Sequence, residues 1–404
     1  MQDLPIPRIG RRDLFPRLQA RAYLSHAAIS PPSLLVERAV QEALSDYATL
    51  GVGAFPLWAE RREQLRGALG RLLQVDPSLV AVTPGTTHSI TQLAFGLPWR
   101  RGERVVLFRG EFPANVTPWQ RAAEHFDLEL DWLPLPPCRR EEGASPEDPS
   151  GFVLEHLERC LRRGARLVAV SAVQFQTGLR MPLTAMAELC HRYGAELAVD
   201  GIQACGAVPL AVGDAKIDYL ACGAHKWLLG VEGVGFTYVR KERAAALVPR
   251  LAGWLSHEAG EAFLVEGSGH LRYDRPFKPA PACFEGSSSN VLGLAALQAS
   301  VGMLLELGVE SIFDHIQGYL DLLEAGLTEL GCHSVRARHP ESRSCILSVQ
   351  LPEGASGGAV IARLRQAGVA VSHPDGLVRF APHFSNDLDE IPFVLEQTRR
   401  ALRP

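Results

Sequence analysis

The chain has 404 residues, of which 47% are hydrophobic, so it is long enough to bury a large core. Its 41 basic and 45 acidic side chains give a net charge of −4, which offers no electrostatic footprint for nucleic acid or an anionic membrane. Eight cysteines without a CxxC pair predict neither a disulfide framework nor a metal site. Without a signal-peptide pattern or a long apolar run, we expect a cytoplasmic protein.

Between about residues 80 and 240, short apolar strands alternate with amphipathic helices. Strands are expected at 104–110, 165–173, 196–200, 218–223 and 233–240, with a helix at 183–193 and a polar surface loop at 138–151. Continuous apolar strands suit a parallel sheet covered on both faces. This alternation predicts an α/β domain.

The C-terminal hundred residues repeat a simpler pattern. After a helix from about 293 to 307, we expect a strand at 345–351, a helix near 359–366, a strand through 378–380 and a final helix from Asp389. These elements predict a smaller α+β domain. We expect residues 20–285 to form the large domain, and residues 1–19 with 286–404 to form the small one.

The first candidate motif is a glycine followed by two threonines, in the segment TPGTTH at 83–88. It precedes an apolar helical run, so its backbone N–H groups and the helix dipole can bind a phosphate. Simple helix capping is the alternative. A dinucleotide fingerprint receives no support, because Gly230, Gly233 and Gly235 do not make GxGxxG between a first strand and its helix.

Asp200 is the second candidate, because it ends an apolar strand in the segment AVDGIQ. The carboxyl end of a strand is where open α/β sheets bind ligands. A carboxylate buried there needs a partner, and a protonated ring nitrogen of a cofactor would be suitable. Capping of the next helix is the alternative.

Lys226 follows the next apolar strand, in the segment GAHKW. Desolvation in apolar surroundings lowers the pKa of a lysine, which makes it a plausible nucleophile for a Schiff base. An exposed loop lysine is the alternative. Arg379, in the strand pattern LVRF, is flanked by apolar residues, and its planar guanidinium suits capture of a carboxylate. An internal ion pair is the alternative for this arginine.

In this order along the chain, these segments resemble the class V aminotransferases of fold type I. The similarity is to the branch with isopenicillin N epimerase-like proteins, cysteine desulfurases and kynureninases. It extends from about Tyr23 to Arg399 and is strongest over 200–240. It implies an α/β fold, with a mainly parallel seven-stranded sheet between helices and a smaller α+β domain. It also implies pyridoxal 5′-phosphate as cofactor, a small amino-acid substrate and a homodimer with shared active sites.

The resemblance also implies roles for single residues. Lys226 is expected to hold the cofactor as a Schiff base and to shuttle protons, and Asp200 to pair with the pyridinium nitrogen. Arg379 is expected to receive the substrate α-carboxylate. The other cofactor contacts implied are Gln203 at the phenolic oxygen, Phe112 stacked on the ring, Ser171 and Thr177 on its other side, Gly85, Thr86, Thr87 and His225 at the phosphate, and Ser288 at the phosphate of the neighbouring subunit.

The sequence departs from the family pattern at three places. Position 223 is a glycine where many desulfurases have a phosphate-binding serine, and Ser287 replaces a usual glycine. The segment 369–377, VAVSHPDGL, has no cysteine where desulfurases carry their nucleophile, and Cys345 falls in a strand pattern. We therefore expect an enzyme that is not a cysteine-nucleophile desulfurase.

The resemblance implies chemistry at Cα of an α-amino acid, through an external aldimine and a carbanion. Loss of a β-substituent would make the enzyme a lyase, for example by C–S cleavage, and protonation at the cofactor would make it an aminotransferase. Epimerisation is a third alternative, and it needs a second base. A non-catalytic cofactor-binding protein is a further alternative, against which the presence of both Lys226 and Arg379 argues.

Overall fold

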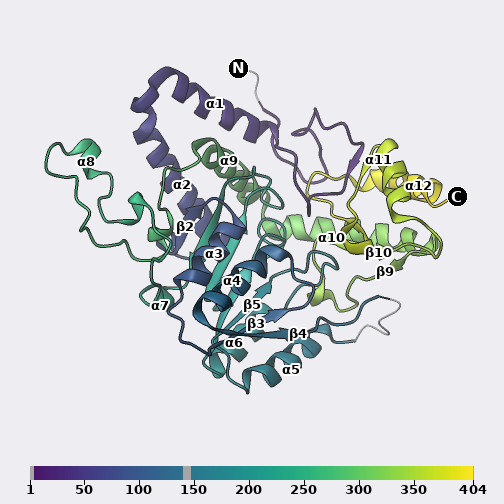
Figure 1. Ribbon diagram of the computed structural model, residues 1–404. Coiled ribbons are helices and arrows are strands. Elements are labelled where there is room, and N and C mark those ends of the chain that lie inside the picture. Colours follow the sequence, from purple (N-terminus) through teal and green to yellow (C-terminus); the bar gives the residue numbers. More distant parts are fainter. Residues whose placement is uncertain (1–3, 140–146, 404) are drawn as a thin grey trace.

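The computed structural model describes residues 4–139 and 147–403. A seven-stranded sheet lies at its centre, in the order β2-β8-β7-β6-β5-β3-β4 (Figure 1). The strands are β2 (Val80–Thr83), β3 (Arg104–Phe108), β4 (Glu129–Leu133), β5 (Leu167–Ser171), β6 (Glu196–Asp200), β7 (Tyr219–Gly223) and β8 (Gly235–Val239). Among these strands β8 alone runs in the opposite direction to the other six, so the prediction of a mainly parallel seven-stranded sheet is confirmed.

Helices cover both faces of this sheet. On β6, Leu197 and Val199 contribute to the core cluster shared with one set of helices, and Ala198 contributes to the cluster on the other face. The first face is covered by α2 (Phe55–Leu73), α5 (Pro149–Leu161), α6 (Leu183–Arg192) and α9 (Val291–Leu307), and the second by α3 (Thr86–Gly96) and α4 (Thr117–Phe126). Burial on both faces explains why these strands are almost continuously apolar.

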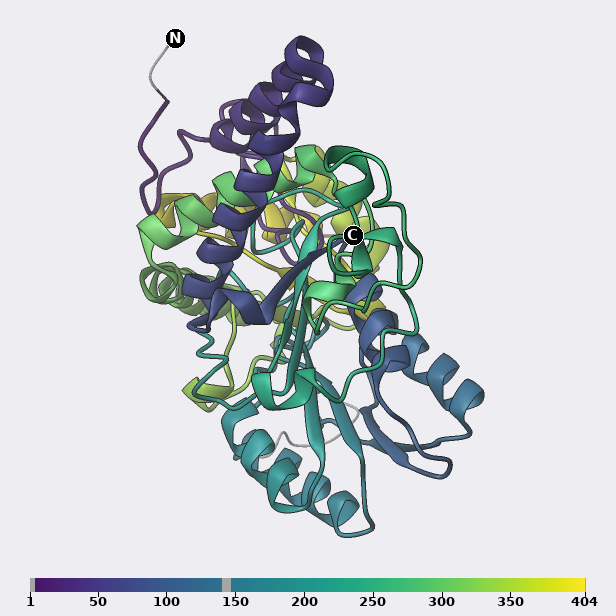
Figure 2. The same ribbon diagram turned by 90° about the vertical axis from the view of Figure 1, so that its left-hand side faces the viewer.

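Helix α1 (Leu34–Leu50) and α2 form a hairpin that projects from the rest of the molecule (Figures 1 and 2). Two short helices, α7 (Lys241–Ala244) and α8 (Ala262–Val265), follow the last strand of the sheet. The predicted surface loop at 138–151 lies partly outside the described residues, and α5 begins within it at Pro149.

The C-terminal part has a three-stranded antiparallel sheet in the order β12-β10-β9. It comprises β9 (His333–Ser334), β10 (Leu347–Gln350) and β12 (Val378–Phe380), and its helices are α10 (Val309–Glu329), α11 (Gly357–Gln366) and α12 (Ile391–Ala401). Near the N-terminus, β1 (Ala22–Tyr23) pairs in parallel with β11 (Val369–Ala370). The division of the chain at residue 285 stays a prediction.

Across the described ranges, no single helix is both long and apolar enough to cross a membrane. Helices α9 and α10 satisfy that requirement only as a pair, bent by 77° at the break between them.

Candidate active site

A cavity of about 510 Å³ opens at the carboxyl ends of β6 and β7, beside the start of α3. It brings together residues that are far apart in the sequence. The predicted site residues that line it are Gly85, Thr86, Thr87, Phe112, Asp200, Gln203, His225, Lys226 and Arg379. The parallel strands deliver several of these side chains to one edge of the sheet, as the fold class requires.

Asp200, the last residue of β6, buries its carboxylate at the base of this cavity. The side chain is 2% exposed, and its Oδ1 accepts one hydrogen bond from the backbone N–H of Ile202 at 2.9 Å. Burial raises the pKa of Asp200 to about 7. A cation placed beside this carboxylate would restore its ionised form, because opposite charge lowers the pKa of an acid.

Lys226 lies in the loop after β7 and is 8% exposed. Its Nζ is 5.3 Å from the centre of the Phe112 ring, and within the described residues it makes no hydrogen bond. Burial lowers the pKa of this lysine to about 8, partly offset by the charge of Asp200. A larger share of the amine is therefore unprotonated near neutral pH than for a lysine in water.

The backbone of this loop is held from two distant parts of the chain. Ser30 Oγ donates to the carbonyl of Lys226 at 2.6 Å and is bonded to His26 Nδ1 at 2.8 Å. His383 Nε2 bonds to the carbonyl of Trp227 at 3.0 Å. Because the carbonyls of Lys226 and Trp227 are both hydrogen-bonded, the backbone that carries the lysine side chain has a defined position.

Gln203 is oriented by bonds on both ends of its amide. Its Nε2 donates to the carbonyl of Ala27 at 3.0 Å, and its Oε1 accepts from Trp227 Nε1 at 2.8 Å. An amide nitrogen carries two hydrogens, so one N–H remains for a ligand in the cavity. Next to the loop lysine, His225 also lines the cavity, and burial lowers its pKa.

The start of α3 provides an anion site at one end of the cavity. Thr86 Oγ1 is buried and has no hydrogen-bond partner among the described residues. A Cβ added at Gly223 would lie 3.2 Å from that oxygen, so the glycine leaves space beside it. Free backbone N–H groups at a helix start attract phosphate, and the orphaned hydroxyl is a further donor.

Arg379 on β12 faces the cavity without an ionic partner. Its Nε donates to Ser372 Oγ at 3.0 Å and its Nη1 to the carbonyl of Phe175 at 2.6 Å. Across residues 4–139 and 147–403, no carboxylate lies within ion-pair distance of the guanidinium, and burial lowers its pKa to about 10. An internal ion pair, the alternative that the sequence left open, is absent from this part of the chain.

Three predicted site residues lie elsewhere. Ser171 is buried at the end of β5 and hydrogen-bonds to Glu111 through its N–H and its hydroxyl. Thr177 Oγ1 accepts from the N–H of Leu179 at 3.2 Å, and the threonine lines a separate small cavity. Ser288 is exposed and lines a second, neighbouring cavity. Their predicted cofactor contacts stay predictions.

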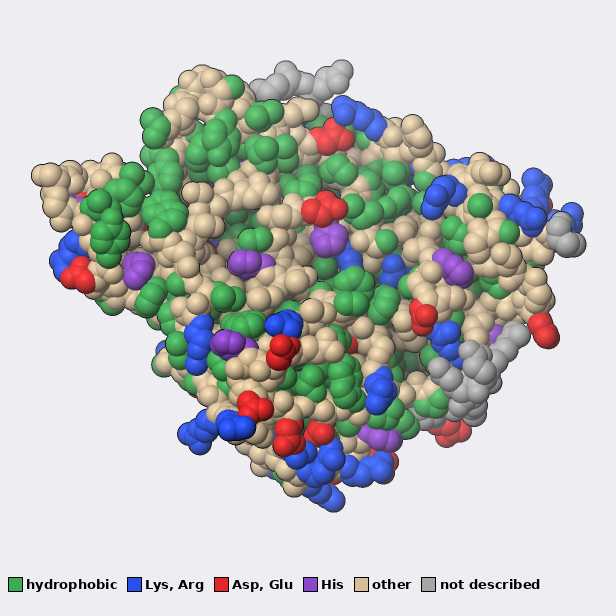
Figure 3. Space-filling model, viewed as in Figure 1, with side chains coloured by type: hydrophobic (Ala, Val, Ile, Leu, Met, Phe, Trp, Pro, Cys, Tyr) green, Lys and Arg blue, Asp and Glu red, His purple; other side chains and the backbone are tan. Residues whose placement is uncertain are grey.

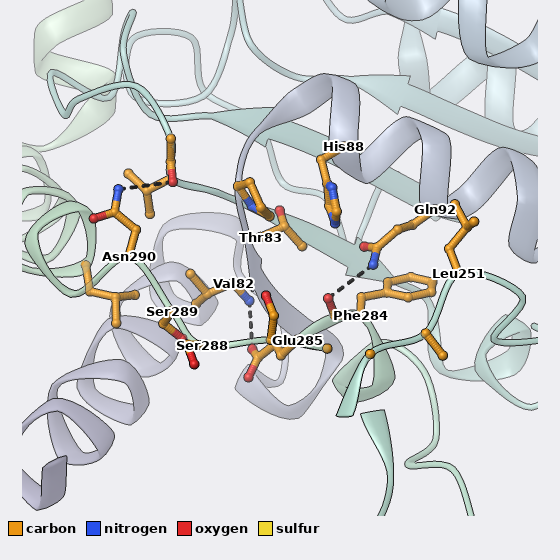
Figure 4. Close-up of a pocket in the computed structure, with 18 residues that line it drawn as sticks. Val82, Thr83, His88, Gln92, Leu251, Phe284, Glu285, Ser288, Ser289 and Asn290 are labelled. Atoms are coloured by element: carbon orange, nitrogen blue, oxygen red, sulfur yellow. Dashed lines mark hydrogen bonds between the residues drawn. The ribbon is translucent and has the colours of Figure 1, made fainter. Parts of the chain in front are cut away.

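That second cavity, of about 450 Å³, shares Pro84, His88, Gly233 and Val234 with the first. Figure 4 shows Ser288 on the segment that leads to α9, with His88 on the facing helix α3. Gln92 is the other labelled side chain of that helix, and its Nε2 donates to the carbonyl of Phe284 at 3.1 Å.

The cavity wall also includes residues that the sequence motifs did not single out. Ala27, Ala28, Phe175 and Pro374 supply apolar surface, and Glu232 supplies a carboxylate. For Phe175, one signal was available, because it lies two residues before Thr177 in a segment already assigned to the site.

The donor set fits pyridoxal 5′-phosphate. The cofactor has an aldehyde for an amine, a ring nitrogen for a carboxylate and a phosphate for a helix start. Lys226, Asp200 and Thr86 each present the matching group to one cavity, and each lacks a complete set of protein partners. The fold and the site together define a fold type I enzyme that depends on this cofactor.

Comparison with known proteins identifies the family. Residues 22–378 match the family model described as Aminotransferase class-V, so the chain belongs to the class V aminotransferases. It is 27% identical to the uncharacterized aminotransferase YcbU of Bacillus subtilis, with 96% of each chain covered. It is 28% identical to a probable cysteine desulfurase of Chlamydia trachomatis, over 82% of this chain and 79% of the relative.

Solved structures show the same fold. One is a C-DES mutant with glycine covalently linked to its PLP cofactor. It has a TM-score of 0.85 at 22% identity and covers 96% of this chain and 98% of that one. Another is the cystine C-S lyase C-DES with its product cysteine persulfide, with a TM-score of 0.84 at 22% identity over 95% of this chain and 99% of that one.

The prediction that this enzyme is not a cysteine-nucleophile desulfurase is wrong. Relatives named as probable cysteine desulfurases match 82%, 79% and 86% of the chain. The exclusion depended on one short segment without a cysteine, 369–377. The absence of a cysteine from one short segment does not separate this chain from relatives that match most of its length.

Proposed function

We propose that this enzyme binds an α-amino acid, removes its Cα proton and releases a substituent from Cβ, as a lyase that cleaves a carbon–sulfur bond. The observation that carries the proposal is the guanidinium of Arg379, which has no ionic partner among residues 4–139 and 147–403 and lies in the same cavity as the buried amine of Lys226. An arginine without an ionic partner can bind a carboxylate through two parallel hydrogen bonds. The names of the desulfurase and C-S lyase relatives support carbon–sulfur cleavage.

The residues of the cavity have distinct tasks in this proposal. Arg379 holds the substrate carboxylate and thereby directs the Cα hydrogen towards Lys226, whose Nζ takes up the proton. Asp200 keeps a negative charge beside the ring nitrogen of the cofactor. Phe112 and Phe175 form an apolar wall that excludes water from the reacting atoms. When bound, pyridoxal 5′-phosphate supplies the electron sink for the charge that develops at Cα.

Amino-group transfer is the second candidate. It is favoured by the relative YcbU, named an uncharacterized aminotransferase, because the match covers 96% of both chains. The same residues would bind the amino acid in either reaction. The two differ in what happens after the proton has left Cα.

Product analysis separates the two reactions. We expect the purified holoenzyme to convert L-cysteine or L-cystine to pyruvate and ammonia in equal amounts, with release of sulfide or persulfide, and without any added keto acid. An aminotransferase would instead need a keto-acid acceptor and release no ammonia. Turnover that occurs only with an acceptor would contradict the lyase proposal, and alanine with released sulfur would show a desulfurase.

We also propose that the enzyme is a homodimer with shared active sites. Exposed hydrophobic side chains gather over α1, α2 and α8 (Figure 3), among them Val52 at 92% and Leu264 at 62% exposure. An apolar surface of this kind marks a protein interface. The contact of Ser288 with the phosphate of the neighbouring subunit is a part of the proposal that rests on the resemblance. The cytoplasmic location is proposed from the sequence pattern alone.

Sedimentation of the holoenzyme tests the dimer. We expect a species of twice the 44.0 kDa chain mass, and a shift towards monomer when Leu264→Glu places a charge in the apolar patch. Leu322→Glu is the matched control, because Leu322 is 55% exposed on α10, away from the patch. A monomeric wild-type enzyme, or equal shifts in both variants, would contradict the assignment.

A further inference from the structure

Glu111 is a buried carboxylate next to the active-site cavity, although it does not line it. The side chain is 8% exposed and accepts four hydrogen bonds. Its donors are the N–H of Ser171 at 2.8 Å, the hydroxyl of the same serine, Gln174 Nε2 at 2.9 Å and Asn115 Nδ2 at 3.3 Å. Burial raises the pKa of Glu111, and the donors favour its ionised form.

These bonds join two segments that both reach the cavity. Glu111 directly precedes Phe112, and Ser171 ends β5, from which the chain continues through Gln174 to Phe175. The rings of Phe112 and Phe175 meet edge to face, with centroids 5.3 Å apart, and both line the cavity. The carboxylate of Glu111 therefore holds the segment that carries Phe112 against the segment that carries Phe175.

The second segment also orients Arg379. Its Nη1 donates to the carbonyl of Phe175, the residue after Gln174. The segment turns back at once, because the N–H of Gly178 donates to the carbonyl of Gln174 at 2.8 Å, and the N–H of Gln174 donates to the carbonyl of Leu179 at 2.9 Å. The direction of the Phe175 carbonyl thus depends on where Gln174 is anchored, and its side chain is anchored on Glu111.

We propose that Glu111 is a positioning residue for the substrate-carboxylate site, acting through Gln174 and the Phe175 carbonyl on the guanidinium of Arg379. The inference rests on the proposed function, in which Arg379 receives the α-carboxylate. An amide in place of this carboxylate turns one acceptor into a donor. At the position of Oε1 this donor faces both the backbone N–H of Ser171 and Nε2 of Gln174, and at the position of Oε2 it faces the hydroxyl of Ser171 and Nδ2 of Asn115. A donor without an acceptor moves away, and the Phe175 carbonyl moves with its segment.

The test compares two ligands that differ in one carboxylate, L-alanine and ethylamine. Dissociation constants for the holoenzyme come from the absorbance change of its bound cofactor. We expect Glu111→Gln to raise the constant for L-alanine about tenfold and to change that for ethylamine less than about twofold, in line with the loss of a charged hydrogen bond. Glu196→Gln is the matched control, because Glu196 is also a buried glutamate, lies at the amino end of β6 and does not line the cavity.

A second variant tests the same proposal if Glu111→Gln does not fold. Gln174→Leu removes one hydrogen bond to Glu111 and leaves the carboxylate and its bonds to Ser171 in place. Gln174 Oε1 already lacks a partner among the described residues, so the variant loses little else. We expect it to weaken L-alanine binding selectively, in the same direction as Glu111→Gln.

Arg379→Ala, measured in parallel, separates two kinds of failure. If Arg379→Ala weakens L-alanine selectively while Glu111→Gln and Gln174→Leu weaken both ligands equally, the positioning role of Glu111 fails and the carboxylate site stands. If Arg379→Ala weakens both ligands equally, the carboxylate site fails and the positioning role fails with it.

Discussion

The amino ends and the carboxyl ends of β6 and β7 both bury ionisable side chains, but the two sets differ in their partners. At the amino ends, Glu196 forms ion pairs with Arg166 at 2.6 Å and with Arg243 at 3.2 Å. Asp218, which is fully buried, pairs with Arg243 and His191, each at 2.8 Å. Every charge named here has a partner supplied by the chain itself.

At the carboxyl ends the partners are incomplete. Asp200 accepts one backbone hydrogen bond, Lys226 makes none within the described residues, and Arg379 faces no carboxylate there. Burying a charge is unfavourable unless it is paired. The charges at the amino ends of the strands are paired within the protein, whereas those at the carboxyl ends need a ligand to complete their interactions. The comparison shows that burial alone does not mark a functional residue. A buried charge with partners in the protein has a structural role, whereas a buried charge without such partners marks a ligand site.

The largest effect is expected from the lysine at the incomplete end. Lys226→Ala should abolish the covalent link to the cofactor and lower turnover at least about 10³-fold, because both the attachment point and the proton acceptor are removed. Borohydride reduction followed by peptide mass spectrometry measures the link. In the wild type, the mass of the reduced cofactor should lie on the peptide of Lys226.

The other lysines of the chain are Lys216, Lys241 and Lys278, and none of them is buried. Lys241→Ala, at the start of α7, is the control and should keep both the link and the activity. A reducible adduct that survives in Lys226→Ala would overturn the assignment of Lys226.

Removing a buried negative charge should have a smaller effect, on the stability of the cofactor-free protein. We expect this effect to be destabilising at the amino ends of β6 and β7 and stabilising at their carboxyl ends. Asp218→Asn should lower the free energy of unfolding by roughly 3 kcal/mol, because it removes the buried carboxylate that pairs with the partly buried Arg243 and His191. Asp200→Asn should raise it at pH 8, because an amide can still accept from Ile202 and is not charged. Urea unfolding of both variants measures the difference.

The effect at Asp200 has a defined dependence on pH. Its pKa is about 7 in the folded chain, against 3.8 ordinarily, so the folded state keeps a proton that the unfolded state releases. Stability from this group is therefore lost as the pH rises from about 4 to 7, by up to about 4 kcal/mol. The advantage of Asp200→Asn should shrink as the pH falls towards 5, and an advantage independent of pH would contradict this account.

Much of the site could be predicted from the sequence because parallel strands deliver their carboxyl-end residues to one edge. Asp200 and Lys226 each follow an apolar run, and runs of that kind are buried on both faces of the sheet. The fold class followed from the same runs. By contrast, the hairpin of α1 and α2 was not predicted, and its exposed apolar side chains, such as Tyr47 and Phe55, do not follow the usual amphipathic pattern.

Other features depend on tertiary contacts that no local pattern carries. Glu111 meets Ser171 across 60 positions of sequence, so its role could not be inferred from its neighbours. The resemblance implies cofactor contacts for Ser171 and Thr177, which stay predictions, and in the structure each side chain forms a hydrogen bond within the protein. The exclusion of desulfurases was wrong because it depended only on the segment 369–377, which has no cysteine, and not on the rest of the site.

The bond between His383 and the loop of Lys226 has a consequence for how the protein is made. The two partners, His383 and Trp227, are 156 residues apart, and the histidine is synthesised later. Until that segment has left the ribosome, the loop lacks one of the bonds that fix its backbone. The complete cavity, which also includes Arg379, can therefore form only after this C-terminal segment has been synthesised.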